Sequence, residues 1–233
     1  MHAQRHPSVI LLDALGTLVA LEPPAPRLRV ELAERFGLVV TEEQAMSAIA
    51  AEIGYYRKHL DEGRDTASLA ALRGRCAEVL RSALPGAAGI EPHRIVEALL
   101  ASLRFTAFAE VRPALDAARA RGQRLVVVSN WDVSLHDVLR RVGLKPQLDA
   151  ILTSAEVGAR KPAPAMFERA LGLLGAGAEE AIHVGDSLEE DVAGARAAGI
   201  EAVLVCRDGA GPAPGVRTIS SLAQLTDLTL PAC

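Results

Sequence analysis

The sequence has few aromatic residues, few cysteines and no long apolar run. Only 3% of its 233 residues are aromatic although 50% are hydrophobic, so we expect a core built mostly of Ala, Val, Leu and Ile. The three cysteines, an odd number, lie far apart at Cys76, Cys206 and Cys233. They argue against a disulfide framework, favour a reducing compartment, and form no spacing with histidine that suggests zinc. No stretch approaches the roughly 18 apolar residues of a membrane span.

The sequence also lacks an excess of positive charge. The formal net charge is -4 and the isoelectric point is about 5.9, which argues against sequence-independent binding to nucleic acid. The apolar run near the N-terminus is too short for a signal sequence. We therefore expect a cytoplasmic protein with a small-molecule ligand and no nucleic-acid or membrane partner, either a monomer or a homodimer.

Five short apolar runs predict the strands of a parallel sheet. Each is strand-length and apolar without alternation, as in strands buried on both faces. Helical patterns lie between the later runs, and one begins at Pro162 while another spans Glu189 to Ala198. Alternation of strands and helices indicates an α/β fold with right-handed crossovers. The five runs are Val9–Leu12, Leu125–Val128, Ala150–Leu152, Ala181–Val184 and Ala202–Val205.

About 110 residues separate the first run from the second, and this segment is helical in character. Thr41 and Gln44 form a capping box at the start of a helix that runs towards His59. Similar patterns cover Arg27–Phe36, Thr66–Leu84 and Pro92–Leu103. The sequence therefore predicts an α/β core domain, residues 1–19 and 107–233, and an inserted helical domain, residues 20–106.

Polar residues follow several of the predicted strands. Asp13 ends the first, Ser129 and Asn130 the second, and Asp186 the fourth, while Lys161 follows the third after a short loop. Ligands of open parallel sheets bind beyond the carboxyl ends of the strands, so these side chains are expected to converge. Two carboxylates can hold a divalent cation, and a hydroxyl and an ammonium can neutralise a phosphoryl group. Taken singly, each has a structural interpretation as a cap or a solvated loop residue.

Four motifs in order resemble those of the haloacid dehalogenase superfamily. They are VILLDALGTL at residues 9–18, VVVSN at 126–130, KPAP at 161–164 and HVGDSLEED at 183–191. The helical insertion after the first motif is similar to the cap domain of the subgroup that contains haloacid dehalogenases and many small phosphatases. The resemblance covers nearly the whole chain and implies a Rossmann-like core with a helical cap, whose closure excludes water.

The resemblance implies a role for each matching residue. Asp13 is the nucleophile and becomes a covalent aspartyl ester or phosphate. Ser129 hydrogen-bonds a phosphoryl oxygen, with Asn130 beside it. Lys161 orients the nucleophile and offsets charge. Asp186 binds Mg²⁺.

The remaining implied ligands surround the same ion. Asp13 itself and the main-chain carbonyl of Leu15 contact Mg²⁺, and Asp191 supports it directly, through water or through the lysine. Gly16 and Thr17 begin the exit towards the cap. Trp131, the single tryptophan, either covers the site and contacts substrate or packs against the following helix.

Leu15 departs from the family pattern, because the phosphatases carry an acidic residue two positions after the nucleophile. That residue protonates the leaving group and activates water, which is worth roughly 10²–10⁴-fold. The sequence therefore predicts a Mg²⁺-dependent phosphohydrolase on a small phosphorylated metabolite, with weak general-acid catalysis and a preference for acyl or aryl phosphates. Asp132 or His183 could replace the acid. Alternatively, Asp132 caps the following helix and His183 points into the core.

Two alternatives remain open. A 2-haloacid dehalogenase also lacks the second acidic residue, since halide leaves without a proton, but it needs no metal, and Asp186 with Asp191 resembles the metal-binding form of the motif. The other alternative is a non-catalytic relative that binds a phosphorylated ligand or a partner protein. Retaining a buried anionic cluster without use for it costs stability, which argues against this reading.

Overall fold

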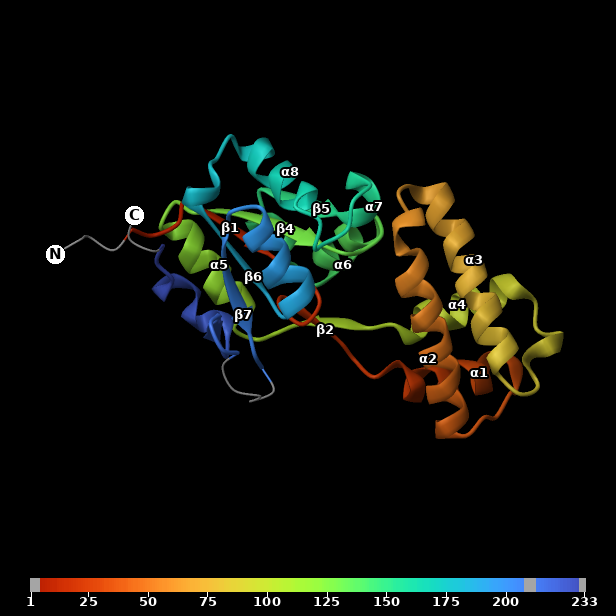
Figure 1. Ribbon diagram of the computed structural model, residues 1–233. Helices are drawn as coiled ribbons and strands as arrows, with labels where there is room; N and C mark the ends of the chain where they lie inside the picture. Colours follow the sequence, from red (N-terminus) through yellow and green to blue (C-terminus); the bar gives the residue numbers. More distant parts are fainter. Residues whose placement is uncertain (1–4, 208–212, 231–233) are drawn as a thin grey trace. The chain divides into compact units, whose positions relative to one another are not determined.

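The computed structural model describes residues 5–207 and 213–230 of the chain (Figure 1). Two compact units are present. The first combines Met1–Ala20 with Ala107–Cys233, and the second is Leu21–Thr106. We refer to them as the α/β unit and the helical unit and describe each by itself.

The α/β unit contains a six-stranded sheet in the order β5-β4-β1-β6-β7-β8. All neighbouring strands are parallel, and β1 lies between β4 and β6. The α/β fold class is thus confirmed. The strands are β1 Val9–Leu12, β4 Arg124–Ser129, β5 Ala150–Thr153, β6 Ala181–Gly185, β7 Glu201–Val205 and β8 Arg217–Ile219.

All five predicted strands are present, whereas β8 was not predicted. Its three residues, Arg-Thr-Ile, are too short and too polar to form an apolar run, and it lies at the edge of the sheet. Two further short strands, β2 Val19–Leu21 and β3 Phe105–Ala107, form a separate ladder. They lie where the chain leaves the α/β unit and where it returns.

Helices cover both faces of the sheet (Figure 1). Val9, Leu11 and Val126 pack with Met166 and Phe167 of α8 on one face, in a cluster of almost fully buried residues. Burial of apolar surface on this face stabilises the folded state by about 25 cal/mol per Å². The helices of the unit are α5 Val111–Ala120, α6 Leu135–Arg141, α7 Ser154–Val157, α8 Ala165–Leu174 and α9 Gly194–Ala197.

Two predicted helices differ from the structure. The helix expected to begin at Pro162 begins at Ala165, because a turn closed by the bond from Ala163 N to Arg160 O (2.8 Å) precedes it. The helix expected over Glu189 to Ala198 is a π-helical segment, Leu188–Ala193, followed by the short α9. Such wider turns are frequent at functional sites, and here the segment carries Asp191.

The helical unit consists of α1 Pro24–Phe36, α2 Glu42–His59, α3 Thr66–Ala83 and α4 Pro92–Ser102. The capping box at Thr41 is present: Gln44 N donates to Thr41 Oγ1 (3.1 Å) and Thr41 N donates to Gln44 Oε1 (2.8 Å). Apolar residues from all four helices, including Leu28, Ile49, Leu72 and Ile95, form its own buried core. Within the described residues, no helix has the length and hydropathy needed to cross a membrane. The stretch 208–215, rich in glycine and proline, is predicted to be a loop and falls mainly outside these residues.

Candidate active site

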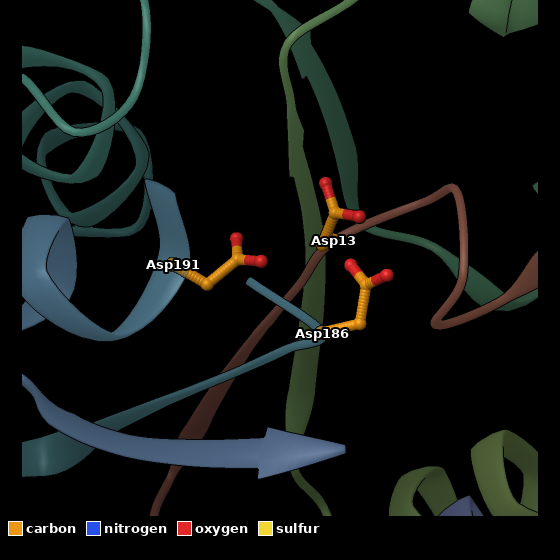
Figure 2. Close-up of side chains that lie close together, drawn as sticks. All are labelled: Asp13, Asp186 and Asp191. Atoms are coloured by element: carbon orange, nitrogen blue, oxygen red, sulfur yellow. The ribbon is translucent and has the colours of Figure 1, made fainter. Parts of the chain in front are cut away.

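The carboxyl ends of β4, β1 and β6 bring the site together. Ser129 is the last residue of β4, Asp13 follows β1, and Asp186 follows β6. Because these strands are adjacent and parallel, their terminal side chains lie at one edge of the sheet. Figure 2 shows Asp13, Asp186 and Asp191 with their carboxylates facing a common space, and carboxylate oxygens of the three lie within 4.8 Å of one another.

Lys161 lies between two of these carboxylates. Its Nζ is 2.6 Å from Asp13 Oδ1 and 2.6 Å from Asp191 Oδ1. Ser129 Oγ also donates to Asp13 Oδ1, at 2.9 Å. Among the described residues, the hydrogen bonds to the Asp13 side chain thus end on Oδ1, which leaves Oδ2 as the oxygen able to attack a ligand. Lys161 is only 1% exposed, so its interactions are poorly screened by water.

The lysine and the two carboxylates stabilise one another's charges. Burial would lower the pKa of Lys161, but attraction to Asp13 and Asp191 outweighs it and raises that pKa above its ordinary value. Burial would raise the pKa of Asp191, but Lys161 and a hydrogen bond from His183 hold it below its ordinary value. For Asp13 burial prevails, and its pKa is raised in spite of Lys161 and Ser129.

Asp186 adds to the negative charge that the lysine does not offset. Although its side chain reaches solvent, the surrounding protein reduces its hydration, and with repulsion from Asp13 and Asp191 this raises the pKa of Asp186 to about 7. With all groups ionised, one ammonium and three carboxylates leave two negative charges. Oxygen ligands and this residual charge fit a divalent cation such as Mg²⁺.

The bonds to Asp191 favour an indirect role for this residue. Its Oδ1 accepts from Lys161 Nζ and from His183 Nε2 (2.8 Å), and its Oδ2 accepts from Ser187 N (3.0 Å). Both oxygens are therefore already engaged. The Cβ of any residue replacing Gly185 would lie 2.1 Å from Asp191 Cγ, so a glycine is required where the carboxylate packs against the end of β6.

Asn130 holds the loop that carries Lys161. Its Nδ2 donates to Lys161 O (3.0 Å), and Lys161 N donates to its Oδ1 (2.8 Å). Such a reciprocal pair fixes the main chain of Lys161 and so directs its ammonium. Trp131 is 7% exposed and its carbonyl accepts from Ala155 N (3.2 Å). Of the two interpretations of Trp131, this burial favours packing.

His183 and Asp132, the two possible replacements for the missing acid, have other contacts. His183 is fully buried, donates to Asp191 and packs edge-on against Phe167 with ring centroids 4.9 Å apart. Asp132 is 3% exposed and its Oδ1 accepts from Ser134 N (2.7 Å) at the start of α6. Leu15, by contrast, is 37% exposed. The contacts of His183 and Asp132 favour the structural interpretation of these two residues.

Three contributors to the site are not evident from the sequence. His183 was considered as an acid or a core residue but not as the partner of Asp191. Glu190, beside Asp191, is half-buried and hydrogen-bonds Asn130. Arg207, two residues after β7, donates to the carbonyl of Gly16 (2.9 Å). The rule that places functional residues beyond strand ends, applied to the fifth strand as well, would have found Arg207.

Comparison with known proteins adds the family to this geometry. The sequence profile of the haloacid dehalogenase-like hydrolases matches residues 7–199. The chain is 44% identical over 100 residues to haloacid dehalogenase-like hydrolase domain-containing protein 3 of Bos taurus, covering 43% of this chain and 38% of that protein. It is 39% identical over 146 residues to phosphoserine phosphatase of Thermus thermophilus, covering 60% of this chain and 58% of that protein. The alignments thus span less than two thirds of either relative.

Solved structures extend the similarity over nearly the full length. The 2-haloacid dehalogenase of Pseudomonas syringae pv. Tomato superposes with a TM-score of 0.65 at 26% identity, covering 94% of this chain and 96% of that chain. A phosphatase and a dehalogenase are therefore both similar to this chain, so similarity by itself does not choose between the two reactions.

Proposed function

The chain belongs to the haloacid dehalogenase-like hydrolases, and on that basis we propose that it is a Mg²⁺-dependent phosphohydrolase of small phosphorylated metabolites. The observation that carries the proposal is the third carboxylate. Asp186 lies within reach of Asp13 and Asp191, and its pKa is raised to about 7 by reduced hydration and by their repulsion. A halide-releasing site has no need of this uncompensated charge, whereas a cation-dependent site does.

Asp13 performs the attack in this proposal. Its Oδ2 bonds to the phosphorus of the substrate while the bond from phosphorus to the leaving oxygen breaks, which gives an aspartyl phosphate. Water then cleaves that phosphate from Asp13 and releases inorganic phosphate. Lys161 and Ser129 hold Oδ1 at 2.6 and 2.9 Å, so the nucleophile is oriented before substrate arrives, which lowers the entropic cost of reaction.

Asp13, Asp186 and the main-chain carbonyl of Leu15 would hold the Mg²⁺ ion, and Asp191 would contribute through Lys161. When bound, the ion supplies positive charge that offsets the phosphoryl oxygens and the carboxylates. The bonds already made by both oxygens of Asp191 support giving it this indirect role. Asn130 acts on the same charges by fixing the lysine loop.

Leu15 determines which leaving groups suit the site. An apolar side chain cannot donate a proton, so the leaving oxygen must depart as an anion or take a proton from water. General-acid assistance contributes roughly 10²–10⁴-fold, and substrates that do not need it lose least. We therefore propose acyl and aryl phosphates as the preferred substrate class.

A specific observation favours 2-haloacid dehalogenation as the second candidate. Halide leaves without a proton, so Leu15 would cost this reaction nothing, and the Pseudomonas syringae dehalogenase is similar to this chain over nearly its whole length. Asp13 Oδ2 would then attack carbon and form an ester. The surplus carboxylate at Asp186 argues for ranking this reaction below phosphate hydrolysis.

One set of assays separates the candidates. Hydrolysis of p-nitrophenyl phosphate and acetyl phosphate is measured with Mg²⁺ or with EDTA, beside chloride release from 2-chloropropionate. We expect phosphate release that requires Mg²⁺ and is lost in Asp13→Asn. Asp116→Asn, an isosteric change on the exposed face of α5, is the matched control and should retain activity. Chloride release indifferent to EDTA would instead establish the dehalogenase, and silence in both assays would leave a binding protein.

A further inference from the structure

Arg207 makes four contacts at the point where the chain leaves and re-enters the α/β unit. Its Nε donates to Gly16 O (2.9 Å) and its Nη2 to Thr17 O (2.8 Å). Nη1 donates to Glu110 Oε1 (2.5 Å), and the guanidinium carbon lies 3.6 Å from the centroid of the Phe108 ring. The side chain is 17% exposed. One guanidinium thus ties the outgoing segment to the returning one.

The outgoing segment is the loop that follows Asp13. It is closed by bonds from Leu18 N and Val19 N to Ala14 O, at 2.8 and 2.9 Å. Gly16 lies directly against Asp186, since a Cβ at this position would be 2.1 Å from Asp186 Oδ2. A shift of Gly16 would therefore displace the loop relative to both Asp13 and Asp186.

The chemistry of the contacts requires an arginine. Two carbonyls and a carboxylate are met by three different nitrogens of one planar group, while its face stacks on an aromatic ring. Glu110 offsets the positive charge of Arg207. Burial would raise the pKa of Glu110, but the hydrogen bond and the attraction to Arg207 help to hold that pKa below its ordinary value. A lysine has a single nitrogen and cannot reach the same set of acceptors.

We propose that Arg207 is a positioning residue for the reaction. Its guanidinium fixes the carbonyls of Gly16 and Thr17 and so holds residues 14–19, which we call the nucleophile loop, in a fixed position against Asp186. Arg207 itself touches neither Asp13 nor Asp186 in any described hydrogen bond or ion pair among residues 5–207 and 213–230. Its effect on turnover rests on the proposed function, whereas its effect on the loop does not. We call the contacts of Arg207 with Gly16, Thr17, Glu110 and Phe108 the clamp. Loss of the clamp displaces the attacking carboxylate, and small displacements of this kind can cost about 10²-fold in rate.

The test uses Arg207→Ala and Arg207→Lys in the full chain. Arg217→Ala is the matched control, because Arg217 also donates to two main-chain carbonyls, Thr229 O (2.6 Å) and Asp227 O (3.4 Å), but not to the nucleophile loop. We measure kcat and KM for acetyl phosphate with Mg²⁺, and hydrogen exchange of the amides of residues 14–19. Glu110→Gln is the second variant in case Arg207→Ala does not fold. It removes the carboxylate of the ion pair and leaves both carbonyl bonds of Arg207 in place.

We expect kcat of Arg207→Ala to fall by about 10–10²-fold with KM little changed. Exchange should accelerate in residues 14–19 and not elsewhere in the α/β unit, and added guanidinium ion should restore part of the kcat of Arg207→Ala but not that of Arg217→Ala. Arg207→Lys should remain impaired. The proposal is overturned if kcat stays within about twofold of the parent, or if exchange accelerates throughout the unit.

The exchange arm separates this inference from the proposed function. If the parent chain hydrolyses no phosphate ester, the proposed function fails, but the loop amides still report on the clamp. If the parent is active and Arg207→Ala leaves exchange in residues 14–19 unchanged, the clamp fails alone.

Discussion

The α/β unit and the helical unit bury acidic side chains under different conditions. In the α/β unit, Asp13 and Asp191 both lie 2.6 Å from the ammonium of Lys161. In the helical unit, Glu52 of α2 is 5% exposed and is hydrogen-bonded to the thiol of Cys76 on α3. Lys161 holds the pKa of Asp191 below its ordinary value against the effect of burial, whereas burial raises the pKa of Glu52 and the thiol reverses only part of this.

The difference teaches what a buried carboxylate needs. A neighbouring cation can hold its pKa down against burial, as Lys161 does for Asp191 though not for Asp13. A weak neutral donor such as the Cys76 thiol reverses only part of the effect of burial. Among the described residues of the site, Lys161 is one cation for the three carboxylates of Asp13, Asp186 and Asp191, so the site keeps a surplus negative charge that an external cation can offset. At Glu52 burial raises the pKa, so this carboxyl takes up a proton more readily than an exposed glutamate does. The first arrangement suits chemistry and the second suits packing.

Removal of Lys161 should break the comparison most severely. In Lys161→Met, Asp13 and Asp191 lose their cation while remaining buried, and we expect the free energy of unfolding to fall by about 3–5 kcal/mol. Urea unfolding at neutral pH measures the loss, with Lys145→Met as control because Lys145 is exposed. Adding Asp191→Asn to Lys161→Met should return part of the stability. Equal losses in the two single variants would contradict this account.

An added carboxylate at position 15 should sharpen the comparison in activity. Leu15→Asp supplies a group able to protonate a leaving oxygen, so we expect hydrolysis of an alkyl phosphate to rise by about 10²-fold and that of acetyl phosphate to change little. Steady-state rates with Mg²⁺ for both substrates give the ratio. Leu15→Asn is the matched control, because its side chain has similar shape but no proton to transfer. A rise of the same size in both variants would show that polarity, and not acid catalysis, is responsible.

Much of the core can be predicted from the sequence, because buried strands require apolar residues and therefore appear as apolar runs. The runs at Val9–Leu12 and Ala181–Val184 are apolar on both faces, as only strands between two helical layers need to be, and both strands are present. The strand-end rule then places Asp13, Ser129 and Asp186 at one edge without further information. Strand β8 lacks such a run and was missed.

The partners within the site could not be predicted in the same way. Sequence spacing does not reveal that Asn130 bonds the main chain of Lys161, 31 residues away, or that His183 bonds Asp191. The π-helical segment that presents Asp191 also differs from the α-helix that its pattern predicts. These features depend on distances between elements, which only the folded chain defines.

The surplus charge should appear as a pH dependence of the metal-free chain. The pKa of Asp186 is about 7 in the folded chain against an ordinary value of 3.8, so between these values the folded state binds more protons than the unfolded state. Asp186 therefore contributes a loss of stability as the pH rises towards 7 and no further change above it. The melting temperature in EDTA from about pH 5 to 8 should fall, and Asp186→Asn should flatten the fall, whereas Asp116→Asn should not. An unchanged slope in Asp186→Asn would assign the surplus charge elsewhere.

Replacement of Glu52 should have the smallest effect and tests the other side of the comparison. The raised pKa of Glu52 means that its ionisation destabilises the helical unit as the pH rises above the ordinary value of 4.5. Glu52→Gln keeps the shape and removes the charge, so we expect a gain on the order of 1 kcal/mol at neutral pH that vanishes in acid. Urea unfolding at two pH values measures it, beside Glu34→Gln on the exposed face of α1. A loss of stability instead of a gain would mean that Glu52 stays ionised with a cationic partner, and that both units bury acids in the same way.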